Sequence, residues 1–403
     1  MFLTSGVVRF SLIKLCLLAF LFGHFPAWSL DFNLKDEFCS KSLNTFGPAY
    51  GLNLRQRTRD LVNHTEQLGL CEAFQLQEVW RESHREHLET KMLNRFGLMN
   101  SVFYDVTRSD NGQSGLKSLF PSGTVLLASS HIFTVNRKGL LDWFRKRLGV
   151  VKAYARASVY YPDRPLLSQV QHLNTHLHHS SQDIRLTQIL QMAQEFTADQ
   201  SFVQPWLASG DFNAVPKSLE WYLMTSVFGF KDSFTEAYEN PDNPNPCTYC
   251  RGNPLSLDPF RSRRIDYIFY RSAYQIELHA ANARVVFNQA PFVSDHFGVE
   301  AELNLSATDS YLVYQERFPQ AEDFAQQSHI LNTVIERLQS SRIRGVHRFV
   351  APAKDLLQRF QNPSLEDPLI DFLWHQPGGL PYPADIDFVD DFFMGDFVDE
   401  EQL

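Results

Sequence analysis

The sequence predicts an α/β domain in which strands and helices form layers. Apolar and polar residues alternate through 73–80, which predicts a strand, while 55–70 and 83–96 have the apolar spacing of helices. Strand and helix therefore follow one another along the chain, as they do in layered α/β folds. A hydrophobic content of 44% beside 21% charged residues is ordinary for a chain that buries a substantial core.

The remaining elements follow the same rules. Strands are expected at 42–47, 73–80, 124–129, 153–161, 169–175, 206–208, 264–271 and 297–305, with helices at 55–70, 83–96, 182–196 and just beyond Pro216. Residues 105–123 are rich in Asp, Ser, Asn and Gly and predict a long loop. Residues 240–259 hold five prolines and predict another.

After about residue 306 the pattern becomes helical. Apolar residues from Phe324 to Leu338 and from Val346 to Phe360 recur at helical spacing, which predicts a pair of helices packed on the main domain. We therefore divide the chain into a main α/β domain at 30–305, a helical extension at 306–362 and an acidic, Phe-rich tail at 363–403. The tail is expected either to be disordered or to dock through its Phe side chains.

The first 29 residues have the features of an export signal. Arg9 and Lys14 precede an apolar stretch at 15–25, and Ala27-Trp28-Ser29 has the small-x-small pattern of a cleavage site. An uncleaved anchor is the alternative. We expect a secreted or periplasmic protein with no transmembrane segment after the signal.

Four cysteines follow the signal region: Cys39, Cys71, Cys247 and Cys250. An even number in an exported chain permits disulfides. Cys39 and Cys71 each stand just before a predicted strand, so their thiols could meet if those strands are parallel neighbours. Cys247 and Cys250 could close a small loop; a zinc half-site is the weaker alternative because no second ligand pair has matching spacing.

The net charge of −9 is concentrated at the C-terminal end. Residues 360–403 carry eleven acidic side chains and neither Lys nor Arg, which leaves 30–359 with equal numbers of acidic and basic residues. Nucleic-acid affinity depends mainly on a basic excess. The composition therefore argues against a nucleic-acid substrate.

The stretch from Pro205 to Pro216 holds the most informative local pattern. An apolar run ends at Ser209-Gly210, and Asp211 and Asn213 follow two residues apart, a spacing that places both on one face of a strand. A carboxylate beside a carboxamide suits a hydrated cation, a phosphate, or both. The alternative is a strand-end turn in which both side chains only cap backbone amides.

Other polar residues stand at or near predicted strand ends. They are Asn44, Glu78, His176, Asp266, Asp295 and His296. Each has a simpler interpretation: Glu78 as a surface acid, His176 as one of three loop histidines, Asp266 as a turn cap and Asp295 as a helix N-cap. Their occurrence together, in order within one α/β domain, favours a shared site.

The local motifs around these residues resemble those of the endonuclease/exonuclease/phosphatase superfamily. They are Leu-Asn-Thr-Phe-Gly, Leu-Gln-Glu-Val, Asn-Thr-His-Leu, Gly-Asp-Phe-Asn, Arg-Ile-Asp-Tyr-Ile and Ser-Asp-His-Phe-Gly-Val-Glu, spread over residues 38–305. The resemblance implies a four-layer α/β sandwich of two facing mixed β-sheets flanked by helices. It also implies hydrolysis of a phosphate ester that depends on Mg²⁺, with Mn²⁺ as the alternative metal.

The resemblance also implies roles for the metal-side residues. Glu78 would be the main metal ligand, with Asn44 beside it and Asp295 as a second carboxylate. Mg²⁺ favours few carboxylates and retains several waters, so this ligand set is sufficient.

The remaining residues would carry the proton transfers and hold the phosphate. His296 would be the general base, oriented by Asp266, and Asp211 would position or deprotonate the water. Asn213 and His176 would hydrogen-bond the phosphoryl oxygens. The sequence leaves both His296 and Asp211 as candidates for the proton acceptor.

Within the superfamily the motifs are most similar to the neutral sphingomyelinase branch, which cleaves sphingomyelin to ceramide and phosphocholine. The basic, aromatic segment around Trp143 and Phe144 is then a candidate for membrane contact, although a solvated helix face explains such a segment more simply. Two alternatives are a secreted deoxyribonuclease I-like nuclease and a catalytically inactive binding protein on the same fold. The nuclease would require a positive groove, and the binding protein would act through its acidic tail.

Overall fold

A computed structural model describes most of the chain between residues 36 and 375. The described ranges are 36–46, 53–79, 82–96, 100–103, 115–120, 124–135, 152–161, 169–237, 246–256, 258, 260–307 and 319–375. The expected export signal, the Trp143-Phe144 segment and the end of the acidic tail lie outside them. In the described part of the chain, no helix combines the length and apolarity needed to cross a membrane.

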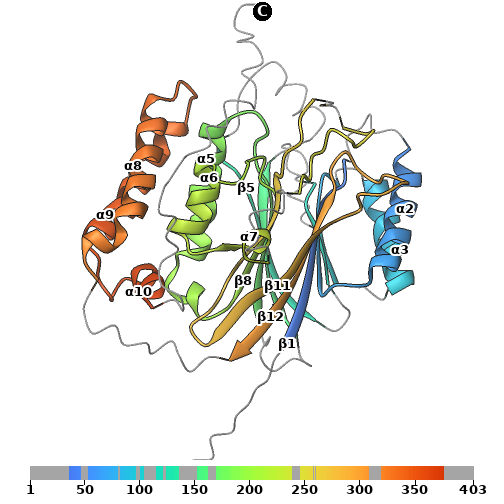
Figure 1. The fold of residues 1–403 in the computed structure, drawn as a ribbon, viewed down its shortest axis with the longest axis horizontal. Helices are drawn as coiled ribbons and strands as arrows, with labels where there is room; N and C mark the ends of the chain where they lie inside the picture. The colour runs from blue at the N-terminus through green and yellow to red at the C-terminus, as the bar shows by residue number, and fades with distance from the viewer. Residues whose placement is uncertain are drawn as a thin grey trace, which may run out of the picture. The chain divides into compact units, whose positions relative to one another are not determined.

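Two six-stranded sheets form the centre of the fold (Figure 1). The first has the order β11-β12-β1-β2-β4-β3 and the second β5-β6-β7-β8-β10-β9. Their strands are β1 (Asp36–Asn44), β2 (Ala73–Gln77), β3 (Asn100–Phe103), β4 (Lys117–Phe120), β5 (Val125–Ile132), β6 (Ala153–Tyr160), β7 (Val170–His176), β8 (Trp206–Asp211), β9 (Lys231–Asp232), β10 (Asp266–Arg271), β11 (Ile276–Val286) and β12 (Gly298–Ala307).

Helices flank the two sheets. They are α2 (Leu54–Leu68), α3 (Glu82–Phe96), α5 (Gln182–Phe196), α6 (Leu219–Tyr222), α7 (Ser233–Ala237), α8 (Ala325–Ser340), α9 (Val350–Gln361) and α10 (Pro368–Trp374), with short 3-10 or π turns at Asp199–Phe202, Leu223–Val227, Ala321–Phe324 and Val346–Phe349. Helices α2 and α3 pack on the first sheet and α5 packs on the second, while α8 and α9 lie on the far side of α5 and share its apolar cluster (Figure 1).

Three apolar clusters separate these layers. Between the sheets, Phe38, Leu207 and Val299 belong to one buried cluster. Outside the first sheet, Phe74 packs with Leu88 of α3. The larger cluster outside the second sheet joins α5 to the C-terminal helices. The predicted four-layer α/β sandwich with a helical C-terminal region is confirmed.

Strand direction brings distant parts of the sequence to one edge of the sandwich. Strands β1 and β2 are parallel, and so are β7 and β8, so the carboxyl ends of all four lie at the same edge. Strands β10 and β12 run antiparallel to β8 and β1, so their first residues reach that edge too. The register pairs Asp211 with both His176 and Asp266.

Several sequence expectations are corrected by the described residues. The predicted loop at 105–123 contains β4, whose Lys117 and Ser118 are buried although their residue types suggested a loop. The long edge strand β11 was not foreseen, because its Ala and Asn residues give weak β propensity. Helix α10 occupies the start of the expected tail and buries Phe372 and Trp374.

Both disulfides that the sequence permitted are present. Cys39 of β1 is bonded to Cys71, which precedes β2, as parallel pairing of these strands allows. Cys247 is bonded to Cys250 within a loop. Cys39 itself lies inside β1 and not before it, because the strand begins at Asp36.

Candidate active site

The eight polar residues singled out from the sequence converge at the edge where the strand ends meet. Asn44, His176 and Asp211 are the last residues of β1, β7 and β8, and Glu78 directly follows β2. Asp266 begins β10, while Asp295 and His296 precede β12. The described residues around Asp295 form no helix, so its interpretation as a helix N-cap is wrong.

Asp211 lies at the centre of the group. Asn44 Nδ2 donates to its Oδ2 at 3.0 Å, and the same oxygen is 3.3 Å from His176 Nε2 and 3.8 Å from His296 Nε2. Burial and the nearby Asp266 raise the pKa of Asp211 to about 6, although His296 opposes the shift. Its other oxygen accepts the Asn213 N–H at 2.9 Å, so Asp211 also makes the capping contact considered as an alternative.

Glu78 forms the second acidic centre. Its backbone is left-handed, with φ of 62°, which is uncommon for a residue with a side chain and marks a constrained position. Burial raises its pKa to about 7; Asp295 and Asp211 add to the shift, whereas Lys152 and His296 oppose it. Glu78 Oε1 is 3.9 Å from His176 Nε2. Glu78 is therefore not a surface acid.

His296 and Asp266 form a buried hydrogen-bonded pair. His296 Nδ1 is 2.8 Å from Asp266 Oδ2, which leaves Nε2 on the side of Asp211. Although burial alone would lower the pKa of His296, the carboxylates of Asp266 and Asp211 raise it well above its ordinary value. An imidazole held in one orientation by a carboxylate is the usual arrangement of a proton-transfer residue.

Two positively charged residues of this region were missed in the sequence. Lys152 Nζ contacts His176 Nε2 and acts electrostatically on Glu78 and Asp211. Arg57 of α2 donates to the carbonyl oxygens of Thr45 and Val293, both at 2.9 Å, and so joins the segments after β1 and before β12. Neither residue belongs to a recognisable motif.

Asn213 differs from the sequence interpretation, which placed it on the same strand face as Asp211, because β8 ends at Asp211. Asn213 follows β8 in a left-handed conformation, and its Nδ2 already donates to Leu177 O at 3.1 Å. A Cβ atom at Gly210 would lie 2.0 Å from Thr175 O, so glycine is required by the neighbouring strand β7.

The three carboxylates of Glu78, Asp211 and Asp295 fit a hard divalent cation. Burial raises the pKa of Glu78, Asp211 and Asp295, so their charged forms are poorly compensated by the protein alone. Asn44 adds an amide oxygen, and such oxygen donors suit Mg²⁺ or Mn²⁺.

A second arrangement of donors overlaps the first. Asp211, Asp266 and His296 each offer a ligand atom, all within 4.8 Å of one another. In this second arrangement, His296 is already hydrogen-bonded to Asp266.

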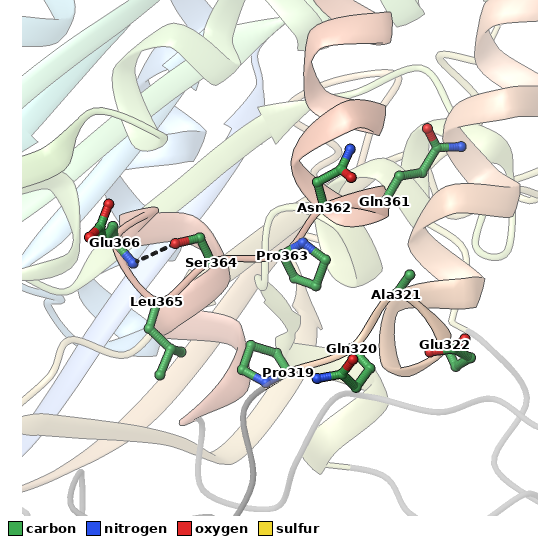
Figure 2. A pocket seen from close by; sticks show the side chains of 10 residues that line it. All are labelled: Pro319, Gln320, Ala321, Glu322, Gln361, Asn362, Pro363, Ser364, Leu365 and Glu366. Carbon is green, nitrogen blue, oxygen red and sulfur yellow. Dashed lines mark hydrogen bonds between the residues drawn. The ribbon is translucent and has the colours of Figure 1, made fainter.

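A hollow elsewhere on the molecule is not part of this site. Its volume is about 670 Å³, and it lies where Pro319–Glu322 meets the turn Gln361–Glu366 that joins α9 to α10 (Figure 2). None of the eight site residues lines it. The chemistry of the strand ends, rather than this hollow, identifies the candidate site.

Comparisons with known proteins agree with the fold and the motifs. No protein-family profile matches the chain. The chain is 28% identical over 288 residues to the inositol phosphosphingolipids phospholipase C of Schizosaccharomyces pombe, an alignment that covers 62% of the chain and 65% of that protein. It is 27% identical over 248 residues to sphingomyelin phosphodiesterase 2 of Rattus norvegicus, covering 57% and 55%. The chain thus spans less than two thirds of the length of either relative.

Solved structures show the same fold. An endonuclease/exonuclease/phosphatase family protein from Bacteroides thetaiotaomicron has a TM-score of 0.51 at 15% identity, covering 68% of this chain and 99% of that one. D. rerio TDP2 complexed with single strand DNA product also has a TM-score of 0.51, at 18% identity, with 67% and 99% covered.

The fold is that of the endonuclease/exonuclease/phosphatase superfamily, and the resemblance predicted from the motifs is confirmed. The two curated relatives are named as an inositol phosphosphingolipids phospholipase C and a sphingomyelin phosphodiesterase.

Proposed function

We propose that the chain is a divalent-metal-dependent phosphodiesterase that cleaves sphingolipids in the manner of a phospholipase C. Sphingomyelin is the proposed substrate, with ceramide and phosphocholine as products. The observation that carries the proposal is the convergence of Glu78, Asp211 and the Asp266–His296 pair on one strand-end edge. The names of the two curated relatives support a sphingolipid substrate.

In this proposal Glu78 holds the metal, with Asn44 and Asp295 beside it. Bound there, Mg²⁺ supplies charge stabilisation to a non-bridging phosphoryl oxygen. Lys152, which already acts electrostatically on Glu78, adds positive charge on the same side. Arg57 keeps the strand-end segments together through its backbone contacts.

The proton transfers belong to Asp211 and His296. Asp211 Oδ2 lies within 4 Å of His176 Nε2 and of His296 Nε2. In this position Asp211 can orient a water for in-line attack on phosphorus. Asp266 fixes the His296 ring, so that Nε2 exchanges a proton with the reacting oxygens. His176 and the remaining amide hydrogen of Asn213 hold the phosphoryl oxygens.

Charge and cysteine chemistry support the proposed substrate class and the proposed location. Because residues 30–359 carry no basic excess, a zwitterionic headgroup at a membrane surface is favoured over a polyanion. The two disulfides support export to an oxidising compartment.

The test compares substrates and variants in one assay. The full chain is incubated with Mg²⁺ and either sphingomyelin vesicles or plasmid DNA, beside Glu78→Gln, His296→Gln and the exposed control Glu302→Gln. We expect phosphocholine release that both site variants abolish and the control retains.

Two outcomes would contradict the proposal. DNA nicking without phosphocholine release would identify the nuclease alternative. Absence of hydrolysis of both substrates, with or without Mg²⁺ or Mn²⁺, would favour a binding protein.

A further inference from the structure

The disulfide-bonded turn Cys247–Cys250 packs directly against the candidate proton-transfer pair. The ring of Tyr249, inside the turn, lies against the His296 ring, with centroids 5.0 Å apart and planes inclined at 57°. The two residues are far apart in sequence, and His296 itself belongs to the segment before β12. A contact of this kind restricts the direction in which the imidazole can tilt.

Thr248 joins the backbone segments that carry both members of the pair. Its side chain is fully buried, and its Oγ1 accepts the N–H groups of Ile265 and Asp266 at 3.0 and 3.2 Å. Its carbonyl oxygen accepts the N–H of Phe297 at 2.7 Å. One residue therefore holds Asp266 at the start of β10 and the neighbour of His296 before β12.

The turn is itself fixed at both ends. Cys247 and Cys250 close it covalently, and Cys250 is buried. Tyr249 and Arg263 exchange backbone hydrogen bonds at 2.9 Å in each direction. Asn253 donates its backbone N–H to Cys250 O at 3.0 Å and its side-chain Nδ2 to Ser294 O at 2.8 Å. The disulfide thus restrains a segment that is already tied to both sides of the pair.

We propose that the Cys247–Cys250 turn is a clamp that sets the mutual geometry of Asp266 and His296, with Thr248 and Tyr249 as its positioning residues. The inference rests on the proposed function for its kinetic consequence, but not for its structural one. Hydrogen-bond length and direction within such a pair depend on small displacements of the two backbones that hold it. A misplacement of this kind affects the chemical step more than substrate binding.

Paired variants test the role of each residue. Thr248→Val keeps the side-chain volume but removes the acceptor for two backbone amides, whereas Thr248→Ser retains it. Tyr249→Leu removes the ring, whereas Tyr249→Phe retains it. We expect kcat with sphingomyelin to fall about 10–100-fold in Thr248→Val and Tyr249→Leu, with little change in KM. The Ser and Phe variants should restore most of the activity.

The disulfide has a matched control in the same chain. Cys39→Ala/Cys71→Ala also removes a disulfide between a buried and a half-buried cysteine. That disulfide lies toward the starts of β1 and β2, whereas the site lies at the carboxyl ends of these strands. We expect Cys247→Ala/Cys250→Ala to lower kcat and the Cys39/Cys71 variant to lower only the melting temperature.

A second readout does not require hydrolysis. The ring N–H proton of His296 in its bond to Asp266 should give a low-field NMR resonance, assigned by its loss in His296→Gln. The clamp predicts that Thr248→Val and Cys247→Ala/Cys250→Ala shift or broaden this resonance, while Thr248→Ser and Cys39→Ala/Cys71→Ala leave it in place.

The outcomes separate the two proposals. A resonance that responds as expected, in a protein that hydrolyses no phosphodiester, would support the clamp and overturn the function. Unchanged resonance and unchanged kcat in folded Thr248→Val and Cys247→Ala/Cys250→Ala would overturn the clamp. Equal losses of kcat in the two cysteine variants would overturn it as well.

Discussion

Among the acidic residues of the site, Glu78 combines a left-handed backbone with a strongly raised pKa. Burial raises that pKa to about 7, so the charged carboxylate is costly in the metal-free protein. Sequence alternation alone would have placed Glu78 on an ordinary strand. The left-handed backbone at Glu78 directs its side chain toward the edge where the strand ends meet.

Replacing Glu78 should separate metal binding from folding. We expect Glu78→Gln to melt at or above the wild-type temperature without metal, because a poorly compensated buried charge is removed. Saturating Mg²⁺ should stabilise the wild type, by about 2.7 kcal/mol at a hundred times its Kd, and stabilise the variant much less. Thermal melts with and without Mg²⁺ measure both effects. An equal Mg²⁺ shift in the two proteins would show that Glu78 is not a ligand, and Glu302→Gln serves as the control.

His172 should make the fold sensitive to acid. Its ring is buried in β7 against Phe38 and Phe120, and burial lowers its pKa from 6.5 to about 3. Between these values the unfolded chain binds a proton that the folded chain does not. The free energy of unfolding therefore falls as the pH drops below about 6.5, by up to about 1.4 kcal/mol per pH unit.

Denaturant unfolding across pH 3 to 6.5 measures this dependence. His172→Gln should flatten the slope, because its side chain does not titrate. The exposed His329→Gln on α8 is the control for the loss of a histidine elsewhere in the fold. If His172→Gln kept the wild-type slope, His172 would not be the source of the pH dependence.

At the scale of elements, the parallel pairing of β7 with β8 brings His176 beside Asp211. Gly210 permits this pairing because a Cβ atom would lie 2.0 Å from Thr175 O. We expect Gly210→Ala to lower the free energy of unfolding by about 2–4 kcal/mol and to displace Asp211.

Gly69 provides a matched comparison for this substitution. It also has positive φ, but nothing lies within 4 Å of an added Cβ. Gly69→Ala should therefore cost only about 1–2 kcal/mol. Chemical denaturation of both variants checks the difference, and equal losses would contradict the close-approach argument.

The disulfide between β1 and the start of β2 should contribute mainly to stability. Cys39 and Cys71 are 32 positions apart, so the bond restricts a long loop in the unfolded chain. We expect Cys39→Ala/Cys71→Ala to lower the free energy of unfolding by about 3–4 kcal/mol. Denaturant titration under non-reducing conditions gives the value, and a loss below about 1 kcal/mol would contradict the loop argument.

At the scale of the whole molecule, the C-terminal helices complete a core that begins in the second sheet. Arg271 of β10 is fully buried among aromatic rings. The centroid of the Phe372 ring, on α10, lies 5.3 Å from the guanidinium carbon of Arg271. Phe372 also packs on Phe202, with centroids 4.9 Å apart. Residues of α8 and α9 belong to the same apolar cluster.

Removing these helices should therefore expose a large apolar surface. We expect a chain ending at Ala307 to bind a hydrophobic dye and to lose its cooperative melting transition, because the outer face of α5 is no longer covered. Differential scanning calorimetry compares it with the full chain. A cooperative transition at the wild-type temperature would show that the extension is a separate unit.

Much of the site could be predicted because its residues occur in short motifs at strand ends. Asp211 follows a strand whose apolar pattern is plain, whereas Asn44 and Asp266 fell inside the strands expected at 42–47 and 264–271 and are in fact end residues of β1 and β10. The sequence could not show Lys152 or Thr248, since their importance comes from contacts made across the fold. Arg57, which donates to a carbonyl 236 positions away, is a further case.

The fold was predictable to a similar degree and for a similar reason. Strong alternation located β2 and strong helical spacing located α5. Strand β11 was not predicted because it is stabilised by pairing with β12. Helix α10 was not predicted because it is stabilised by packing in the apolar cluster that contains α8 and α9. Neither effect leaves a local sequence pattern.

The central claim is that water, activated at the Asp211–His296 side of the site, attacks phosphorus. Hydrolysis of sphingomyelin by the full chain in isotopically labelled water, with Mg²⁺, tests it most directly. Mass spectrometry should find the heavy oxygen in phosphocholine and none in the ceramide hydroxyl, and both products should disappear in His296→Gln. Label in ceramide, or unchanged hydrolysis by His296→Gln, would contradict the account.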